Sequence, residues 1–340
     1  MPTALVTGAS GFIGPRLVMR LQSAGHDVAC LVRPTSKTER LEALGVRLVR
    51  GDVTDPAGLP AALDGVDHVY HLAGRTHARS LAEFLAVNEQ GTTNLMKACA
   101  ARESPPTVLA VSSLAAAGPS APGRPHTESD PPEPISLYGR SKLAGELAAR
   151  RFAAVVPLSI LRPPVVFGPG DRDGLNLFLG LKYSRLHLVP QRKGLPLSLV
   201  HADDLAEAMA LAVERGERVP ADGEADDSTN RGAGVYYAAD PAVSSWAEAG
   251  LLAAAGLGIR VLVIRLRKYP FLIPAAAGEL MGRLTGKPTL FGFDKLREAS
   301  ATGWVCSVEK AAEQLDFRCQ ATLADRYRQT AEWYRSEGWI

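Results

Sequence analysis

A tyrosine and a lysine four positions apart, Tyr138 and Lys142, carry the clearest chemistry in this chain of 340 residues. On a helix, positions four apart share one face, so the lysine ammonium would lie one turn from the phenol. A free tyrosine has a pKa of about 10, and a nearby positive charge lowers it toward neutrality. The pair therefore predicts a proton donor and acceptor for a carbonyl or carbinol oxygen.

The N-terminal segment predicts a dinucleotide-binding site. The β-rich run Thr3–Thr7 leads into a glycine-rich turn, and an apolar-periodic helix follows with Phe12, Ile13, Leu17, Val18 and Leu21. Strand, glycine turn and helix occur in the order that such a site needs. Gly8 permits the tight turn, Gly11 lets the backbone approach a pyrophosphate, and Gly14 lets the helix pack close to the strand. The phosphates would meet the unpaired N–H groups at the helix N-terminus.

Alternating strands and helices would position these residues. Apolar runs predict five further strands at residues 26–32, 46–51, 66–71, 107–112 and 157–162, with helices between them. The fold class expected is α/β: a Rossmann doubly wound parallel sheet with a smaller, mostly helical C-terminal substrate lobe. We assign residues 1–168 to the dinucleotide-binding domain, with 197–240 returning to it, and 169–196 and 241–340 mainly to the lobe. Right-handed crossovers bring the carboxyl ends of the strands to one edge, where cofactor and substrate would meet.

Composition narrows the class of protein. A hydrophobic content of 46% allows a large core, and a formal charge of +2 without a basic stripe predicts no nucleic-acid binding. The four cysteines have no C-x-x-C spacing, so we expect reduced thiols, no metal site and a cytoplasmic protein. The chain enters its first strand without a secretory signal. The cysteines are Cys30, Cys99, Cys306 and Cys319.

Together these motifs resemble the extended short-chain dehydrogenase/reductase superfamily, with its NAD-dependent epimerase/dehydratase fold. The resemblance covers nearly the whole chain, and its motifs occur in the expected order. They are Thr7 to Gly14, His71-Leu72-Ala73, Val87-Asn88 with Gly91-Thr92, Ser112-Ser113, Tyr138-x-x-x-Lys142, Arg162-Pro163, Phe167-Gly168-Pro169-Gly170, Val200-His201-Ala202-Asp203-Asp204-Leu205 and Trp333-Tyr334-Arg335.

The resemblance implies a Ser113, Tyr138 and Lys142 catalytic set. Ser113 rather than Ser112 matches the family's serine, and its hydroxyl would hold the substrate oxygen near Tyr138. Lys142 would bind the nicotinamide ribose and lower the pKa of Tyr138. Asn88 has two open roles, carrying a water of the proton relay or packing helices. The cofactor-binding residues implied are Gly8, Ser10, Gly11, Phe12, Ile13, Gly14, Arg33, Lys37, Asp52, Val53, Leu72, Ala73, Gly74, Asn88, Tyr138, Lys142, Pro163 and Val165.

The end of the second predicted strand indicates NADP, with NAD as the alternative. Members that prefer NAD place an acid there, and this chain has Val32 followed by Arg33. Arg33 offers a bidentate donor to a 2′-phosphate, and Lys37 adds a second charge. The alternative is that Arg33 is only a solvated loop residue. Asp52 resembles the position that holds the adenine amino group, or it is a generic turn residue.

The substrate expected is a bulky hydrophobic alcohol or ketone. Nucleotide-sugar enzymes of the superfamily carry an arginine four residues before His201, where this chain has Leu197, although Arg192 and Lys193 could compensate. The apolar runs 261–264 and 269–277 suit a hydrophobic ligand, or they form ordinary core. The lobe resembles 3β-hydroxysteroid dehydrogenases, sterol-4-carboxylate 3-dehydrogenases and dihydroflavonol-type reductases, which implies a sterol, steroid or flavonoid-like substrate. A nucleotide-sugar epimerase/dehydratase and a non-catalytic NADP-binding regulator are the alternatives.

Two kinds of partner surface follow from the same sequence. Residues 269–277 come after Arg265, Arg267 and Lys268, so the segment allows a peripheral membrane contact but is too short to span a bilayer. The Pro-rich loop 118–134 would shape a substrate mouth, and the acidic stretch 222–234 would be a surface connection. We expect a homodimer in which the Tyr138 helix and a helix over 81–101 pair with their copies. Four apolar positions are expected to be available there: Phe84, Val87, Leu95 and Leu147.

Overall fold

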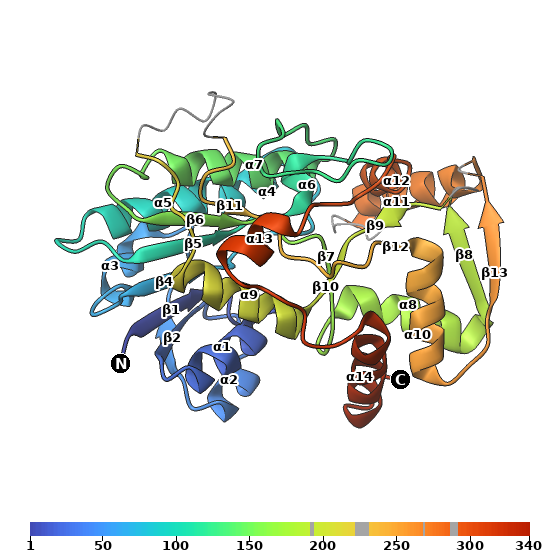
Figure 1. The fold of residues 1–340 in the computed structure, drawn as a ribbon, viewed down its shortest axis with the longest axis horizontal. Coiled ribbons are helices and arrows are strands. Elements are labelled where there is room, and N and C mark those ends of the chain that lie inside the picture. The colour runs from blue at the N-terminus through green and yellow to red at the C-terminus, as the bar shows by residue number, and fades with distance from the viewer. Residues whose placement is uncertain (191–193, 222–230, 268, 286–291) are drawn as a thin grey trace.

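Seven parallel strands form the main sheet of the computed structural model, which describes residues 1–190, 194–221, 231–267, 269–285 and 292–340 (Figure 1). Their order is β11-β6-β5-β4-β1-β2-β3, with neighbours parallel throughout. The reversal of order beside β1 places the carboxyl ends of β1 and β4 at a switch point, where open α/β sheets bind ligands. The strands are β1 Thr3–Thr7, β2 Asp27–Val32, β3 Arg47–Arg50, β4 His68–His71, β5 Thr107–Val111, β6 Leu158–Leu161 and β11 Val235–Tyr236.

The predicted fold class is confirmed, and the predicted strands lie within two residues of the observed ones. β1, β5 and β6 are buried over most of their length, because helices cover both faces of the sheet. One hydrophobic cluster joins the sheet to α1 (Gly14–Ser23) and α9 (Ala202–Glu214), and a second joins it to α3 (Leu59–Ala62) and α5 (Gln90–Ala100). The short helix α2 (Glu39–Ala43) and the 3-10 turn η1 (Pro56–Gly58) fill connections.

Three local expectations need correction. The first helix begins at Gly14, with Phe12 and Ile13 still in the turn, because Pro15 favours the first turn of a helix. The helix expected over 81–101 is two helices, α4 (Leu81–Asn88) and α5, which meet at Glu89. Two of the four apolar positions expected at a dimer surface, Phe84 and Leu95, are buried inside the chain.

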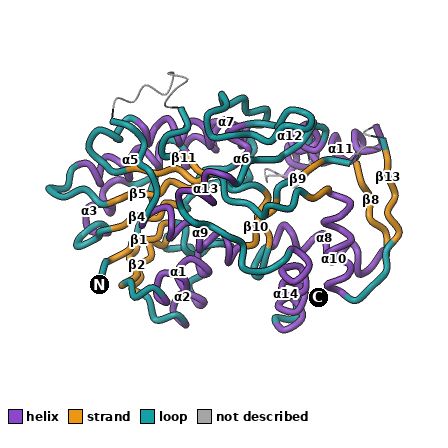
Figure 2. Tube along the Cα trace, viewed as in Figure 1, coloured by secondary structure: helices purple, strands orange, loops and turns teal. Residues whose placement is uncertain are grey.

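The C-terminal lobe consists mainly of helices with short strand pairs, as Figure 2 shows. Strand β8 pairs in parallel with β13, β9 pairs antiparallel with β12, and β7 with β10 links the lobe to the main sheet. The 118–134 stretch forms a connection without named helices or strands, as predicted, while 222–230 lie outside the described residues. The elements are β7 Val165–Phe167, α8 Arg172–Ser184, β8 Leu186–Pro190, β9 Pro196–Leu197, β10 Leu199–His201, β12 Ser244–Ser245, α10 Trp246–Leu257, β13 Leu262–Leu266, η2 Tyr269–Phe271, α11 Leu272–Thr285, α12 Phe293–Ala299 and α14 Leu323–Ser336.

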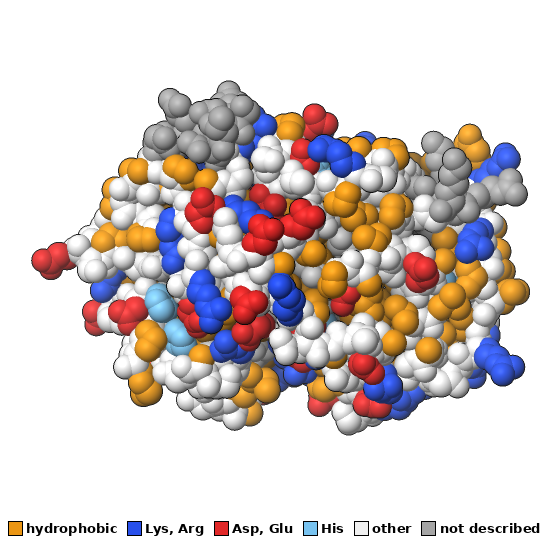
Figure 3. Space-filling view, in the orientation of Figure 1, with side chains coloured by type: hydrophobic (Ala, Val, Ile, Leu, Met, Phe, Trp, Pro, Cys, Tyr) orange, Lys and Arg blue, Asp and Glu red, His pale blue; other side chains and the backbone are white. Residues whose placement is uncertain are grey.

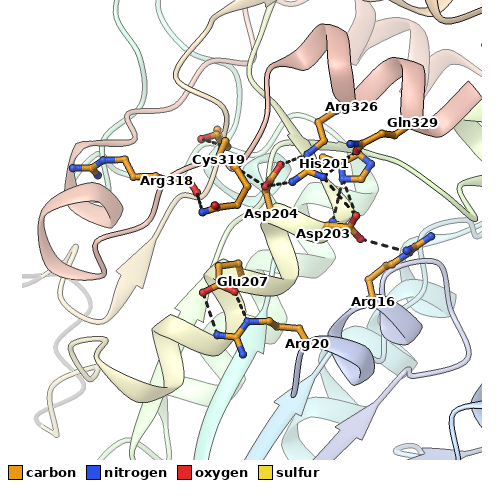
Figure 4. A network of polar contacts seen from close by, with 12 residues as sticks. Arg16, Arg20, His201, Asp203, Asp204, Glu207, Arg318, Cys319, Arg326 and Gln329 are labelled. Carbon is orange, nitrogen blue, oxygen red and sulfur yellow. Dashed lines mark hydrogen bonds and ion pairs between the residues drawn. The ribbon is translucent and has the colours of Figure 1, made fainter. Parts of the chain in front are cut away.

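A buried ion-pair network ties the last helix to the main domain (Figure 4). Arg326 of α14 donates through Nε to Asp204 of α9 at 2.9 Å, and both side chains are buried. Asp203 pairs with Arg326 and with Arg16 of α1. The short helix α13 (Glu309–Gln314) also packs on the main domain, since Ala311 belongs to the same hydrophobic cluster as α1 and α9. Part of the 241–340 segment therefore contacts the sheet domain directly.

Candidate active site

The glycine turn after β1 has the close contacts that a dinucleotide cradle needs. Gly8 has φ +71°, and a Cβ there would come within 2.6 Å of the Ala73 backbone nitrogen. A Cβ on Gly14 would lie 2.1 Å from the Ala9 carbonyl oxygen. At Gly11 the nearest atom to such a Cβ is the Gly8 carbonyl oxygen at 3.2 Å, so its open side faces the cleft. The backbone itself is thus exposed to a ligand at this turn, as the pyrophosphate of NAD or NADP requires.

A cleft of about 1770 Å³ runs from this turn to the C-terminal lobe. The cleft is long enough to hold both halves of a dinucleotide and a substrate, because the glycine turn, the end of β2 and the catalytic helix all line it. Of the predicted site residues, only Asn88 is absent from the described lining. The predicted residues that do line it are Gly8, Ser10, Gly11, Phe12, Ile13, Gly14, Arg33, Lys37, Asp52, Val53, Leu72, Ala73, Gly74, Ser113, Tyr138, Lys142, Pro163 and Val165.

Positive charge gathers where the cleft passes the end of β2. Arg33 and Lys37 line this part together with Glu39 and Asp52, and Arg40 of α2 also lines the cleft but pairs with Glu337 at 3.4 Å. The Ser36 hydroxyl accepts a hydrogen bond from the Arg33 backbone N–H at 3.1 Å, which fixes the turn that carries these residues. Val32 points into the hydrophobic core instead. The ribose and adenine end of a cofactor would therefore meet cations here.

Asp52 lies in the cleft at the end of β3, where its carboxylate is already used. Its Oδ1 accepts hydrogen bonds from the backbone N–H and the hydroxyl of Thr54, both at 2.9 Å. This is the local turn that an aspartate commonly makes. The second carboxylate oxygen remains for an amino group at the same edge, so the adenine role and the turn role are compatible.

Helix α7 (Leu137–Arg150) positions Tyr138 and Lys142. The helix begins after Ser136, whose hydroxyl accepts from the Gly139 N–H at 3.0 Å. Ser113 caps the short helix α6 (Leu114–Ala117) and reaches the Tyr138 phenol. Burial raises the pKa of Tyr138 to about 12, a hydrogen bond from Ser113 lowers it, and the negative charge of Glu298 raises it. The phenol is therefore protonated at neutral pH, ready to act as an acid.

Lys142 is directed toward the end of β5. Its Nζ donates to the Val111 carbonyl oxygen at 2.6 Å, and a Cβ on Gly74 would lie 3.5 Å from the same nitrogen. Burial lowers the pKa of Lys142 to about 8, while the Glu146 carboxylate raises it. Lys142 is not among the described groups that shift the pKa of Tyr138, so the expected lowering is not seen in this arrangement. The carbonyl of Val111 holds the ammonium away from that role.

Beneath the catalytic residues lies a buried ion pair that the sequence reasoning missed. Glu146 accepts from Arg162 Nε at 2.9 Å and from Nη2 at 2.6 Å, and it also accepts from the Ser112 hydroxyl. Burial opposes ionisation of Glu146, but the charge and hydrogen bonds of Arg162 outweigh it and lower the pKa. Both serines line the cleft, but the Ser112 hydroxyl is committed to Glu146, which leaves the Ser113 hydroxyl for a substrate. The available signal was spacing, since Glu146 lies one helical turn beyond Lys142.

Asn88 holds backbone rather than lining the cleft. Its Oδ1 accepts from the Arg75 N–H at 2.7 Å, and its Nδ2 donates to the Arg75 carbonyl at 3.1 Å and to the Ser141 hydroxyl at 2.8 Å. These bonds join the segment after β4 to the catalytic helix. Of the two roles left open for Asn88, the geometry favours packing.

Aromatic and aliphatic side chains form much of the lobe's wall of the cleft. Leu197, at the position where nucleotide-sugar enzymes have an arginine, lies in the lobe's core and not in this wall. Arg192 and Lys193, which could compensate for that arginine, lie outside the described residues. Charged side chains interrupt the apolar wall at the start of α8, with Asp171, Arg172 and Asp173, and on α12, with the pair Lys295 and Glu298. The apolar lining of this part of the cleft includes Leu114, Val165, Val166, Phe167, Leu177, Phe178, Trp246, Trp304, Tyr327, Tyr334 and Trp339.

Helix α12 brings that charged pair to the catalytic helix. Asp294 accepts a hydrogen bond from the Leu137 N–H at 3.0 Å, and Arg297 donates to the Ile135 carbonyl at 3.2 Å. Lys295 and Glu298 are joined at 2.9 Å on the same helix. Sequence reasoning did not find α12, because its hydrogen bonds to the catalytic helix join residues more than 150 positions apart and its seven residues give little periodic signal.

The described residues include no group of three or more His, Cys, Asp or Glu side chains that could hold a metal ion. The four cysteines are free thiols, and Cys30 and Cys99 are buried, as expected. Among the helices of the described chain, none has both the length and the apolar character needed to cross a membrane.

Known proteins share this arrangement over nearly its whole length. The sequence profile of the NAD dependent epimerase/dehydratase family matches residues 4–224. The chain is 32% identical to a ceramide reductase of Caulobacter vibrioides, over 98% of this chain and 95% of that protein. It is 34% identical to sterol demethylase protein B of Methylococcus capsulatus, over 50% of this chain and 53% of that one. The UDP-glucuronic acid 4-epimerase of Bacillus cereus, solved with UDP-glucuronic acid and NAD, has the same fold, with 19% identity, a TM-score of 0.75 and coverage of 98% and 99%.

Proposed function

The chain is an enzyme of the NAD dependent epimerase/dehydratase family, within the extended short-chain dehydrogenases/reductases, and from that premise we propose that it interconverts a secondary alcohol and a ketone on a lipid-like substrate. The observation that carries the proposal is the meeting of Ser113, Tyr138 and Lys142 at a cleft with a largely apolar wall. A sterol, a steroid or a flavonoid suits this wall. The full-length similarity to a ceramide reductase adds long-chain lipids to that group.

The proposed mechanism assigns one task to each catalytic residue. A bound nicotinamide cofactor supplies the hydride for reduction, or accepts it for oxidation. In reduction, Ser113 and Tyr138 hold the ketone oxygen, and the phenol gives its proton to that oxygen as negative charge develops there. The phenolate left behind is stabilised by the Lys142 ammonium, provided that Lys142 turns from Val111 toward it. Oxidation reverses these proton movements, so that Tyr138 acts as the base.

NADP is the proposed preferred cofactor. Arg33 and Lys37 both line the cleft near the end of β2, which supports a site for the extra phosphate. Guanidinium groups form bidentate, charge-assisted bonds with phosphate, so their presence favours the phosphorylated ribose. NAD remains the alternative, as the family description and the ligands of the related structures indicate.

A nucleotide-sugar epimerase or dehydratase is the second candidate. The cleft contains Arg172 and Lys295, which could bind a diphosphate. Leu197, at the position where the superfamily's nucleotide-sugar enzymes carry an arginine, is buried in the lobe's core and adds no charge to the cleft. A purely cofactor-sensing role has less support, because Tyr138 and Lys142 are both retained. The buried free thiols support a reducing compartment such as the cytoplasm.

The test is a substrate panel followed by one substitution. NADPH or NADH absorbance would be followed with 3-oxosteroids, long-chain lipid ketones including an oxidised ceramide, and UDP-sugars. We expect turnover of a lipid ketone, and Tyr138→Phe should abolish it while cofactor binding survives, since the phenol acts on the substrate oxygen. Lys142→Met should impair both turnover and cofactor binding. Ring inversion of a UDP-sugar without turnover of ketones would replace the proposal with the epimerase, and retention of more than roughly a tenth of the rate in Tyr138→Phe would remove that residue from catalysis.

A further inference from the structure

Helix α11 exposes its large apolar residues to solvent. Ile273, Leu280 and Leu284 are 78%, 58% and 73% exposed, and Ala277 lies between them on the same face. These four residues, here called the α11 stripe, follow the i, i+4, i+7, i+11 spacing of one helix face. On the opposite side Ala275 is fully buried. A surface helix normally has the reverse polarity, so this helix fits an apolar surrounding outside the protein.

More apolar surface is exposed elsewhere on the same lobe. The strand pair β8 and β13 exposes Leu186, Leu188 and Leu262, and the turn before α11 exposes Tyr269. Figure 3 shows hydrophobic side chains spread across the lobe on the face drawn, with lysines and arginines near its margin. Tyrosine is a residue that favours the boundary between apolar and aqueous phases.

Positive charge accompanies this apolar surface. Residues 260–285 contain five basic residues and one acidic residue, whereas the whole chain has a net charge of only +2. Arg265 and Arg267 are exposed and lead directly into η2 and α11. Basic side chains beside an exposed apolar helix complement an anionic lipid surface. The charged residues are Arg260, Arg265, Arg267, Lys268, Glu279 and Arg283.

The same surface adjoins the cleft. Helix α11 packs against α12, and α12 carries Lys295 and Glu298 in the cleft wall. Asp294 of α12 also bonds the first turn of the catalytic helix. A surface to which α11 binds would therefore lie close to the mouth of the cleft, through which a substrate enters.

We propose that the α11 stripe inserts into the headgroup region of an anionic lipid bilayer and holds the cleft at its surface. At about 21 Å long, α11 is shorter than the roughly 30 Å of a bilayer's hydrocarbon core, so it lies along the surface. A second copy of the chain is a poorer occupant, because two faces of the same positive charge would repel. The inference deepens the proposed function, on which its purpose rests: a lipid substrate would enter the cleft without crossing water.

Vesicle binding tests this without any turnover. Protein would be sedimented with phosphatidylcholine vesicles containing or lacking phosphatidylglycerol. We expect binding to the anionic vesicles, at least tenfold weaker binding without phosphatidylglycerol, and at least tenfold weaker binding for Ile273→Glu with Leu284→Glu. Val155→Glu is the matched control, because Val155 is 56% exposed on the main domain and should bind as the unmodified protein does. NADPH binding shows that each variant is folded.

Two results would overturn the inference. One is equal vesicle binding by the stripe variant and the Val155 control. The other is a stable dimer in light scattering that the stripe substitutions convert to monomer, with no vesicle binding by the unmodified chain, since a second copy would then cover the face. Failure of the ketone panel leaves the vesicle result standing, so the two proposals fail separately.

Discussion

Tyr138 is surrounded by groups that act on its pKa in opposite directions. Burial and the Glu298 carboxylate raise it, and the hydrogen bond with Ser113 lowers it. Lys142, one turn along the helix, is occupied with the Val111 carbonyl. A catalytic acid works best when its pKa is near the working pH, so the position of the Lys142 ammonium and the charge of Glu298 should both control the rate.

Replacing Glu298 should move the pH profile of the enzyme. Glu298→Gln removes a negative charge that favours the protonated phenol, so the pKa of Tyr138 should fall. For ketone reduction, which needs the phenol, the alkaline loss of activity should then begin at lower pH. Lys295→Met leaves the Glu298 carboxylate without its ammonium partner and should move the profile the other way. Profiles of kcat/KM that coincide for the three proteins would show that Glu298 has no influence on Tyr138.

Replacing Arg33 should remove the preference for NADP. Each charge-assisted hydrogen bond to the 2′-phosphate contributes roughly 1.5–3 kcal/mol, so Arg33→Ala should weaken NADP binding by about tenfold or more and leave NAD nearly unchanged. An aspartate at Val32, where members that prefer NAD have an acid, is a poor companion to this test, because the buried side chain would place a carboxylate in the core. Arg47→Ala, on an exposed arginine of the neighbouring strand, is the control. Dissociation constants that are equal for NADP and NAD in the unmodified protein would make Arg33 an ordinary solvated residue.

At the scale of elements, helix α7 joins catalysis to stability. Its successive turns carry Tyr138, Lys142 and Glu146, and the last of these pairs with Arg162 just after β6. Both side chains of the pair are buried. A buried charge that loses its partner is costly, so the helix is fixed in register against the strand ends that face the cleft.

Replacing one partner of this pair should destabilise the fold more, per substitution, than replacing both partners together. Glu146→Leu or Arg162→Met should each lower the free energy of unfolding by about 3–5 kcal/mol, and the double variant by clearly less than the sum. The pKa of Glu146 is lowered in the fold, so its contribution is present above the ordinary glutamate pKa of about 4.3 and is lost as the pH falls through the lowered value. Denaturant unfolding at neutral and acid pH measures both effects. Additive losses would mean that the two charges act independently.

Local sequence predicted the parts of the fold that depend on local chemistry. The strands were found because branched apolar runs end at glycines and polar residues, and the turn at Gly8 because only glycine fits its backbone. The cleft lining followed from the same turn and the Tyr138 helix. The pairing of Glu146 with Arg162 and the docking of Asp294 on Leu137 could not be predicted, because they depend on which distant segments the fold brings together. For the same reason the sequence predicts Phe84 at the surface, although it packs against Tyr138.

At the scale of the whole molecule, the ion pairs of α9 and α14 join the ends of the chain. Asp203 contacts Arg16 near the N-terminus and Arg326 near the C-terminus. The cleft lies between the parts that these contacts hold together, so its width depends on them.

The surface of α7 is the one expected to form a dimer contact. Leu147 remains 44% exposed there, while Phe84 and Leu95 are buried and Val87 faces the cleft.

A homodimer through α7 is still the prediction, with a smaller apolar contact than the sequence indicated. Light scattering at micromolar concentration should give twice the chain mass, and Leu147→Glu should reduce it to one. Val155→Glu, at an apolar residue that is 56% exposed outside α7, should leave the mass unchanged. A monomer mass for the unmodified protein would contradict the prediction.

The cleft also contains three of the chain's four tryptophans. Trp339 lies near Arg40 of α2 and Arg172 of α8 and stacks with Tyr334, and Trp246 and Trp304 belong to the lobe wall. Indole emission overlaps the absorption of reduced nicotinamides, so a bound reduced cofactor should quench that emission, whereas an apolar ligand should shift the emission wavelength of Trp246 and Trp304. The protein thus has intrinsic fluorescent reporters in its cleft, and the order in which its ligands arrive can be followed without a label.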